Sequence, residues 1–237
     1  FLVTGSSNGF NQVIERDSDK KMSRTENRPL PAGRMKVPEA IMVSIIAGLV
    51  GLFLLYQINY ISFALGLIAL VSYVAIYTPL KKVTPISVFV GAFPGSIPPM
   101  IGYIAATGEF GFEPGMIFLV QFIWQFPHFW AIAWVGHEDY TNVGFRLLPS
   151  KDGEKDYSVG LQSFYFALML IAVSLMPYLM GVTGIISAII VAILGVIYAG
   201  YSWNLYKKCT KEAALKLMFS SFVYLPIALI ALVIDKV

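Results

Sequence analysis

The sequence predicts an all-α protein, a polytopic bundle of transmembrane helices. Of the 237 residues, 57% are hydrophobic and only 13% are charged, which is typical of a membrane protein rather than of a soluble domain. Several apolar stretches are long enough to cross about 30 Å of hydrocarbon, which takes roughly 20 residues. The basic residues gather in alternate loops between these stretches. We therefore expect an integral membrane protein surrounded by lipid, with no nucleic-acid partner.

The predicted helices follow one another with short connections. Residues 1–10 have the pattern of the last turns of a helix whose beginning is absent, so we expect an N-terminally truncated sequence. Full spans are expected near 38–56, 60–79, 86–107, 115–136, 160–180, 184–203 and 217–235. The longest connections, roughly 12–37 and 137–159, are too short for a second folded domain. Residues 1–237 are therefore expected to form a single transmembrane domain.

The span at 86–107 is unusual because it contains Pro94, Pro98 and Pro99. Proline removes a helical hydrogen bond, and the freed carbonyl groups need other partners in a membrane. Two interpretations follow: a broken helix that lines a substrate chamber, or a packed kink. The spacing of Gly91 and Gly95 also permits close contact with a neighbouring helix.

The basic residues define the orientation. Seven Lys or Arg residues lie between 16 and 36, two at 81–82, three between 146 and 155, and four between 207 and 216. The intervening turns at 57–59, 108–114 and 181–183 carry none, so 16 of the 17 cations fall on one side. Because cytoplasmic loops carry the excess of Lys and Arg, that side is expected to be cytoplasmic.

Three oxygen-bearing side chains at the N-terminal end predict a cation site. Asn11, Glu15 and Asp19 are four residues apart, so on a helix they form one stripe. Mg²⁺ binds a few carboxylates while substrate phosphates and water complete its shell, and following arginines can pair the remaining phosphate charge. The pattern predicts activation of a diphosphate. The alternative is that these charges only solvate a loop between two spans.

A second polar cluster extends from the end of the 115–136 span into the following loop. His128 is predicted to lie about 12 Å inside the membrane, at 1.5 Å per residue, where an ionisable side chain is costly. It could bind a metal, contact a substrate or transfer a proton, or it could be a neutral histidine bonded to an adjacent helix. Asp139 and Tyr140 are candidates at the interface, opposite the first acidic loop.

Lys81 and Lys82 serve either as topology signals or as phosphate partners. The single cysteine, Cys209, predicts neither an intramolecular disulfide nor a metal cluster.

Taken together, these motifs resemble the UbiA family of intramembrane prenyltransferases over nearly the whole chain. The resemblance rests on Asn11 to Asp19, Lys21 to Thr25, Asn27 to Pro31, Tyr77-Thr78, Thr84-Pro85, Pro94 to Gly102, Pro127 to Trp130, Asp139-Tyr140, Leu148-Pro149 and Tyr224 to Pro226. Pro127 to Trp130 and the stretch from Asp139 to Pro149 are similar to the branch of the family that modifies haem. The sequence departs from the family pattern at three positions: Glu15 replaces the usual Asp, Ser87 a frequent Asn, and Arg146 a common Pro. The first change keeps the charge, and the other two could affect substrate fit.

The resemblance implies a fold and a reaction. It implies nine transmembrane helices in the intact protein, with helix one and most of helix two missing here. The implied reaction transfers a farnesyl group from farnesyl diphosphate to a vinyl group of haem b, giving haem O and diphosphate, with Mg²⁺ as cofactor. It also implies haem A synthase or terminal oxidase assembly proteins as partners, and a bacterial-type plasma (inner) membrane with the motif loops on the cytoplasmic side.

The site residues are assigned roles by this resemblance. The metal ligands are expected to be Asn11, Glu15 and Asp19, which with Asp139 and Tyr140 form the catalytic set. The diphosphate is expected to contact Arg24, Arg28, Lys81, Lys82 and Arg146. Haem or the prenyl chain is expected to contact His128, Tyr77, Phe129 and Trp130, whose aromatic faces can stabilise an allylic cation.

Two alternatives remain open at this point. Another enzyme of the same family could prenylate a quinone precursor or a chlorin, and it would share the first motif. A transporter of an anionic lipid or metabolite would explain broken helices and polar residues within the membrane without chemistry. A purely structural subunit would not need facing acidic and basic clusters.

Overall fold

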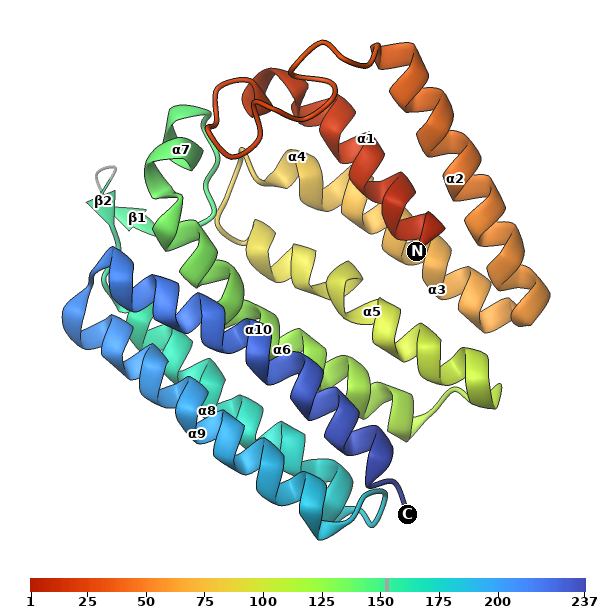
Figure 1. The fold of residues 1–237 in the computed structure, drawn as a ribbon, viewed down its shortest axis with the longest axis vertical. Coiled ribbons are helices and arrows are strands. Elements are labelled where there is room, and N and C mark those ends of the chain that lie inside the picture. The colour runs from red at the N-terminus through yellow and green to blue at the C-terminus, as the bar shows by residue number, and fades with distance from the viewer. Residues whose placement is uncertain (152–153) are drawn as a thin grey trace. The chain divides into compact units, whose positions relative to one another are not determined.

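The computed structural model describes residues 1–151 and 154–237, and the chain forms two compact units (Figure 1). Unit 1 comprises residues 1–109 and 138–147, and unit 2 comprises residues 110–137 and 148–237. Among the described residues, seven helices are long and apolar enough to cross a membrane. The chain is an integral membrane protein built almost entirely from helices.

Unit 1 is built around two helices that pack closely. α1 (Leu2–Asp19) runs beside α2 (Val37–Ile58). The next span consists of α3 (Tyr60–Val71), a π-helical segment η1 (Ser72–Tyr77) and α4 (Thr78–Leu80), and it is followed by α5 (Ser87–Thr107). A short helix, α7 (His137–Asn142), lies at the end of the unit that holds the loop after α1.

Small residues allow α1 and α2 to approach each other. A Cβ atom added at Gly9 would collide with the side chain of Ser44, and one added at Gly48 would lie 2.7 Å from Oγ of Ser6. The hydroxyl of Ser6 donates across the contact to the carbonyl of Ser44 at 2.7 Å. Since lipid supplies no hydrophobic drive for helix association, close packing and interhelical hydrogen bonds hold such a pair together.

Unit 2 is a bundle of four long helices. These are α6 (Phe112–Val135), α8 (Ser158–Leu179), α9 (Ile185–Lys208) and α10 (Lys211–Ile234), each packed against two of the others. A two-residue strand pair, β1 (Ser150–Lys151) and β2 (Glu154–Lys155), precedes α8. The buried centre contains Tyr198 and Tyr224, whose hydroxyls bond to the Trp124 carbonyl and to Ser174.

The structure confirms the predicted spans and corrects two details. The seven long helices match the predicted ranges, with ends displaced by up to six residues. The connection expected to begin near residue 12 begins instead after Asp19, because α1 continues through the whole acidic stripe.

The broken helix proposed for 86–107 is wrong: α5 runs without interruption through Pro94, Pro98 and Pro99. The close contact predicted at Gly91 is confirmed, because this glycine packs against the Tyr77 ring.

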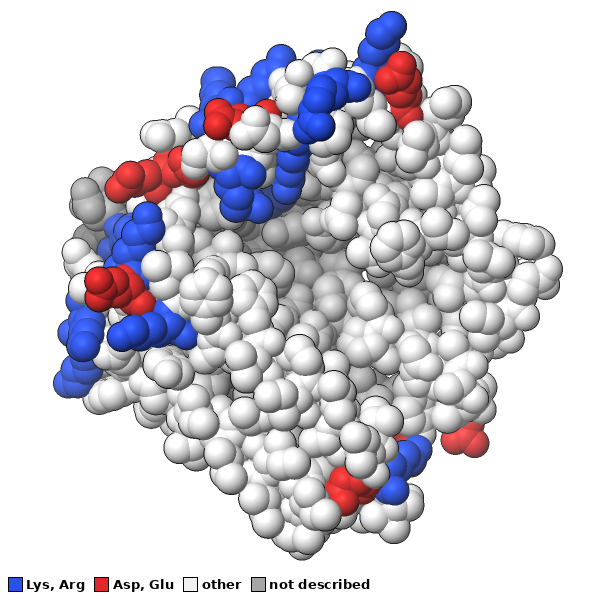
Figure 2. Space-filling model, in the orientation of Figure 1, with Lys and Arg blue, Asp and Glu red and all other residues white. Residues whose placement is uncertain are grey.

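Charged side chains gather at the helix ends within each unit (Figure 2). In unit 1, blue and red atoms cluster over the loop after α1 and over α7, whereas the middle of the helices is white. This distribution is what a membrane-spanning unit requires, because charges in the hydrocarbon region are costly.

Candidate active site

The predicted stripe on α1 lies on one buried face of the helix. Asn11, Glu15 and Asp19 are 7%, 4% and 0% exposed. Asp17, on the same helix, is exposed and forms an ion pair with Arg16 at 3.5 Å. Burial of ionised carboxylates is unfavourable unless cations or hydrogen-bond donors compensate them. The partners of each stripe residue therefore define the site.

Glu15 forms an ion pair with Lys81, which follows α4. Lys81 is itself buried, and its Nζ lies 4.9 Å from the ring centroid of Tyr77 and 5.3 Å from that of Phe145. Burial lowers the pKa of Lys81 from its ordinary value, and the charge of Glu15 opposes this shift. Lys81 thus lies directly against the acidic stripe, and its role toward diphosphate stays a prediction.

Asp19 is held from two sides but keeps one oxygen without a partner. Nη1 of Arg28 donates to Oδ2 of Asp19 at 2.9 Å, and Thr25 donates to the Asp19 carbonyl at 3.0 Å. Oδ1 of Asp19 is buried, and no described residue donates a hydrogen bond to it. Such atoms are rare in proteins because desolvation without a partner is costly. The unpaired oxygen is therefore suited to a ligand.

The loop after α1 also contacts α7, which carries the second predicted acidic motif. Ser23 donates to Oδ2 of Asp139 at 2.8 Å, and Nη2 of Arg24 donates to the hydroxyl of Tyr140 at 3.4 Å. The two segments are more than 110 residues apart in sequence. Both predicted motifs thus meet within unit 1, while a catalytic role for Asp139 and Tyr140 stays a prediction.

Two further predicted diphosphate ligands lie beside this contact. The backbone N–H of Arg146 donates to the Lys81 carbonyl at 2.7 Å, and its guanidinium donates to the Val83 carbonyl at 3.3 Å. Nζ of Lys82 lies 5.9 Å from the ring centroid of Phe145. Arg146 thus fixes the segment that carries Lys81 and Lys82, and its role toward diphosphate stays a prediction.

The remaining predicted contacts belong to unit 2. His128 is buried and stacks on Trp124 with ring centroids 4.5 Å apart. Its Nδ1 lies 2.7 Å from Oγ of Ser221, which donates its own proton to the Met218 carbonyl. His128 is thus bonded to the adjacent helix α10, and its role toward haem stays a prediction.

The neighbours of His128 differ in their surroundings. Trp130 is buried and packs edge-on against Phe166, with ring centroids 5.3 Å apart. Phe129 contacts the His128 ring at 5.3 Å. Contact of these side chains with haem or a prenyl chain stays a prediction.

The side chains of the α1 stripe fit a hard cation that also binds phosphate. They offer one amide and two carboxylate groups, and one buried carboxylate oxygen lacks a partner. Within the described residues, no group of three or more His, Cys, Asp or Glu side chains could hold a metal ion by itself. The arrangement therefore suits Mg²⁺, which retains waters and substrate phosphates in its shell, better than a metal bound only by protein.

Several residues of the site were not singled out from the sequence. Ser23 donates to the Asp139 carboxylate, Thr25 donates to the main-chain carbonyl of Asp19, and Phe145 forms one wall beside Lys81. Thr78 accepts a hydrogen bond from Asn11 across 67 residues. Thr78 lies within a quoted motif, but no sequence spacing indicates its partner.

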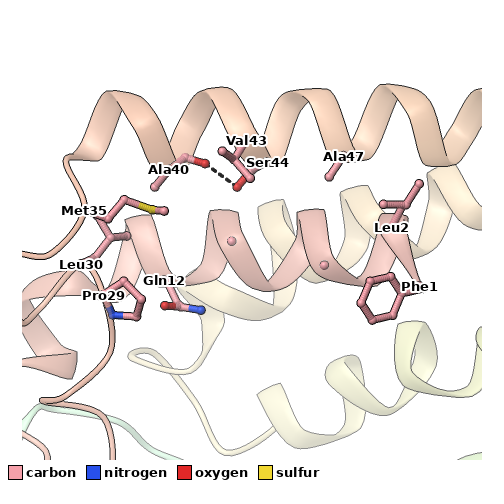
Figure 3. A pocket seen from close by; sticks show the side chains of 12 residues that line it. Phe1, Leu2, Gln12, Pro29, Leu30, Met35, Ala40, Val43, Ser44 and Ala47 are labelled. Atoms are coloured by element: carbon pink, nitrogen blue, oxygen red, sulfur yellow. Dashed lines mark hydrogen bonds between the residues drawn. The ribbon is translucent and has the colours of Figure 1, made fainter.

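An apolar groove of about 310 Å³ runs between α1 and α2 (Figure 3). Its lining includes Leu2, Gln12, Leu30, Met35 and Val43. None of the predicted site residues lines it. The groove is thus separate from the acidic stripe, although both use α1.

Comparison with known proteins places the chain among membrane prenyltransferases. Residues 1–225 match the model of the UbiA prenyltransferase family. A protein of Cytophaga hutchinsonii named protoheme IX farnesyltransferase is 51% identical over 240 residues, covering 100% of this chain and 83% of the relative. Proteins of the same name are 48% identical in Christiangramia forsetii, with 100% and 79% coverage, and 35% identical in Nitrosomonas eutropha, with 99% and 78% coverage.

One solved structure is similar to this fold. It comes from a study titled as concerning digeranylgeranylglyceryl phosphate synthase in membranes, with a TM-score of 0.81 and 23% sequence identity. The match covers 99% of this chain and 82% of that chain. At this identity the likeness concerns the fold alone.

Proposed function

Because the chain belongs to the UbiA prenyltransferase family, we propose that it transfers a farnesyl group from farnesyl diphosphate to a vinyl group of haem b, producing haem O. The observation that carries this proposal is the match, at 51% identity over the whole chain, to a protein named protoheme IX farnesyltransferase. The buried carboxylates and cations of unit 1 supply groups suited to a diphosphate substrate.

The reaction replaces the C1–oxygen bond of farnesyl diphosphate and the π bond of the vinyl group by a new carbon–carbon bond and a new carbon–oxygen bond, and water loses a proton. The bond between C1 of farnesyl and the diphosphate oxygen breaks, and diphosphate leaves with the electron pair. The terminal carbon of the vinyl group attacks C1, which leaves a cation on the adjacent carbon. Water adds to that carbon and loses a proton, giving the hydroxyethylfarnesyl side chain. The protein must therefore stabilise a departing anion and a developing allylic cation.

Arg28 and Lys81 are assigned to the departing diphosphate. Each of them neutralises a carboxylate of the stripe, Arg28 that of Asp19 and Lys81 that of Glu15. Mg²⁺ bound by Asn11, Glu15 and Asp19 would neutralise charge on the leaving diphosphate. The two cationic side chains would then turn from the carboxylates to phosphate oxygens, assisted by Arg24, Lys82 and Arg146. This exchange keeps every buried charge compensated before and after binding.

The aromatic residues are assigned to the cationic and haem portions of the reaction. Tyr77 already lies against a cationic amine, 4.9 Å from Lys81, so its ring face can also stabilise an allylic cation. His128 is assigned to haem, because Ser221 engages its Nδ1 and an imidazole can bind iron through its other ring nitrogen. Phe129 and Trp130 would provide further apolar surface.

The membrane setting follows the same proposal. We place the enzyme in a bacterial-type plasma membrane with the loops after α1 and around α7 on the cytoplasmic side, since 16 of 17 Lys and Arg residues fall on that side. Haem A synthase or terminal oxidase assembly proteins are proposed to receive the product.

The decisive experiment supplies the purified protein, in detergent or membranes, with haem b, farnesyl diphosphate and Mg²⁺. Extracted haems are separated by chromatography and identified by mass spectrometry. A Mg²⁺-dependent haem O product is expected. Release of diphosphate without haem O, in a preparation with intact helical circular dichroism, would indicate a quinone precursor or chlorin as acceptor. If neither diphosphate nor haem O is formed, transport of an anionic lipid or metabolite would be favoured.

A further inference from the structure

The hydroxyl of Thr78 lies between the π-helical segment η1 and the acidic stripe. Thr78 is 2% exposed. Its Oγ1 lies 2.9 Å from the carbonyl of Tyr73, five residues earlier, and 3.2 Å from Nδ2 of Asn11 on α1. The backbone N–H of Thr78 also donates to the Tyr73 carbonyl, as π-helical hydrogen bonding requires. Thr78 therefore connects an irregular turn to a predicted metal ligand.

The number of protons in this chain of contacts fixes the orientation of the Asn11 amide. A threonine hydroxyl has one proton to donate, and the carbonyl of Tyr73 can only accept. If the amide of Asn11 were reversed, its oxygen and the carbonyl of Tyr73 would both face the Thr78 hydroxyl, which has one proton. One of these two oxygen–oxygen contacts would then lack a hydrogen. Both contacts are satisfied only when Nδ2 of Asn11 donates to Thr78. The amide oxygen is then on the opposite side of the group, away from Thr78.

From this we infer that Thr78 is a positioning residue, which holds Asn11 so that its oxygen rather than its nitrogen is available to a divalent cation. The inference rests on the proposed role of the stripe in binding Mg²⁺ with diphosphate. Only the oxygen of an asparagine side chain can ligate a hard cation, because the amide nitrogen has no available lone pair. Partners that orient metal ligands typically account for 10- to 100-fold in metal affinity or activity.

Thr78 has a matched control within the same span. Ser72, at the start of η1, donates its hydroxyl to the Ile68 carbonyl at 2.6 Å, in the same kind of local helix contact. The hydroxyl of Ser72 bonds to the carbonyls of Ile68 and Ala69, both within its own helical span. A Ser72→Ala variant thus removes a helix hydroxyl without changing the orientation of Asn11.

The test measures Mn²⁺ binding by electron paramagnetic resonance in the presence of inorganic pyrophosphate, so that its readout does not depend on haem or turnover. Thr78→Val is expected to weaken Mn²⁺ binding roughly tenfold. Thr78→Ser, which retains the hydroxyl, should remain within about twofold of the unmodified protein, and so should Ser72→Ala. In the Asn11→Ala background, Thr78→Val should cause no further loss, because the group that it orients is absent.

The outcomes separate this inference from the proposed function. Equal Mn²⁺ affinity in Thr78→Val and the unmodified protein overturns the inference, even if haem O is made. Additive losses in the double variant, or equal losses in Thr78→Ser and Ser72→Ala, also overturn it, because they indicate a general structural effect. Failure to make haem O together with the predicted Mn²⁺ pattern would overturn the proposed acceptor and support the role of Thr78. If the unmodified protein binds no Mn²⁺ with pyrophosphate, both the metal role and the inference fail.

Discussion

Arg28 occupies only one side of the Asp19 carboxylate: its Nη1 lies 2.9 Å from Oδ2, while Oδ1 is buried and receives no hydrogen bond from the described residues. An ion pair formed only for stability would be expected to satisfy both oxygens, because an unpaired buried oxygen is costly. A bound ligand that contacts Oδ1 of Asp19 would account for this one-sided ion pair.

The first prediction concerns Asp19. Asp19→Asn keeps the shape of the side chain but removes its charge, so binding of Mn²⁺ in the presence of pyrophosphate and haem O formation should both fall at least 100-fold, the upper range for metal-site changes. The matched control is Asp17→Asn, because Asp17 lies on the same helix but is exposed. Asp17→Asn should retain at least half of the activity. Full activity in Asp19→Asn would refute the metal role.

The second prediction is synergy between cation and anion. A metal alone would confront carboxylates already paired with Lys81 and Arg28, and diphosphate alone would have to draw these cations away from Glu15 and Asp19. Each ligand alone leaves a buried charge uncompensated, which is costly. Pyrophosphate should therefore raise Mn²⁺ affinity by about 5- to 150-fold, the usual range of such coupling, and Mn²⁺ should raise pyrophosphate affinity by the same factor. Calorimetric titration in both orders measures this coupling, and independent binding would contradict it.

The third prediction is a pH dependence that originates at Lys81. Its amine must be protonated to bind phosphate, and burial lowers its pKa. Activity should thus decline with rising pH earlier than an ordinary lysine would allow. Lys81→Arg should be less active at neutral pH because the guanidinium is larger, but its alkaline decline should move to higher pH, since arginine stays protonated.

Lys82→Arg provides the control for this profile. Lys82 is exposed, so its substitution should leave the alkaline limb where it is. Complete pH–rate profiles of the unmodified protein, Lys81→Arg and Lys82→Arg, measured at saturating farnesyl diphosphate, show whether Lys81 causes the alkaline decline. An unchanged alkaline limb in Lys81→Arg would assign the decline to another group.

The fourth prediction concerns the close approach of Gly91 to Tyr77. A Cβ atom added at Gly91 would lie 2.5 Å from Cδ2 and Cε2 of the Tyr77 ring, so Gly91→Ala must displace the ring that faces Lys81. The cost of such overpacking is typically about 1–3 kcal/mol. The variant should unfold at lower temperature in detergent and lose most of its activity.

Gly102→Ala is the appropriate comparison for Gly91→Ala. Gly102 lies in the same helix, and a Cβ atom there would meet nothing within 4 Å. Because alanine is the better helix former, Gly102→Ala should be neutral or stabilise the protein by up to about 1 kcal/mol. Equal destabilisation by both substitutions would show that the contact with Tyr77 is unimportant.

The fifth prediction addresses His128. His128→Ala should weaken haem b binding, measured by its absorption spectrum, while leaving pyrophosphate-dependent Mn²⁺ binding unchanged. Ser221→Ala removes the hydroxyl that bonds to Nδ1 of His128 and should have a smaller effect of the same kind. Normal haem affinity and rate in His128→Ala would exclude its assigned role.

The sequence predicts the long helices well because the membrane imposes a length and a composition on each of them. The burial of Asn11, Glu15 and Asp19 on one face was likewise predictable from a spacing of four residues. The pairing of Glu15 with Lys81 was not, since it joins positions 66 residues apart and depends on how α1 meets the following span. The predictions assigned Lys81 and Arg28 to the substrate diphosphate, and the structure shows them paired with the buried carboxylates of Glu15 and Asp19.

The local departures from regular structure were also outside the reach of sequence patterns. Nothing in the apolar run Ser72–Tyr77 distinguishes a π-helix from an α-helix. The three prolines of α5 indicated an interruption, yet the helix continues through them. Such features depend on tertiary contacts, such as that of Tyr77 with Gly91, rather than on local preference.

The π-helical segment η1 sets how the side chains after it are rotated about the helix axis relative to those of α3. A π-turn accommodates one more residue than an α-turn, and each residue of an α-helix rotates the chain by about 100°. If the same residues formed a regular α-helix, Thr78 and Lys81 would point about 100° away from their present directions relative to α3. Chain length between Ser72 and Tyr77 is therefore part of the site: inserting one residue should turn the cation away from Glu15 without changing any side chain of the stripe.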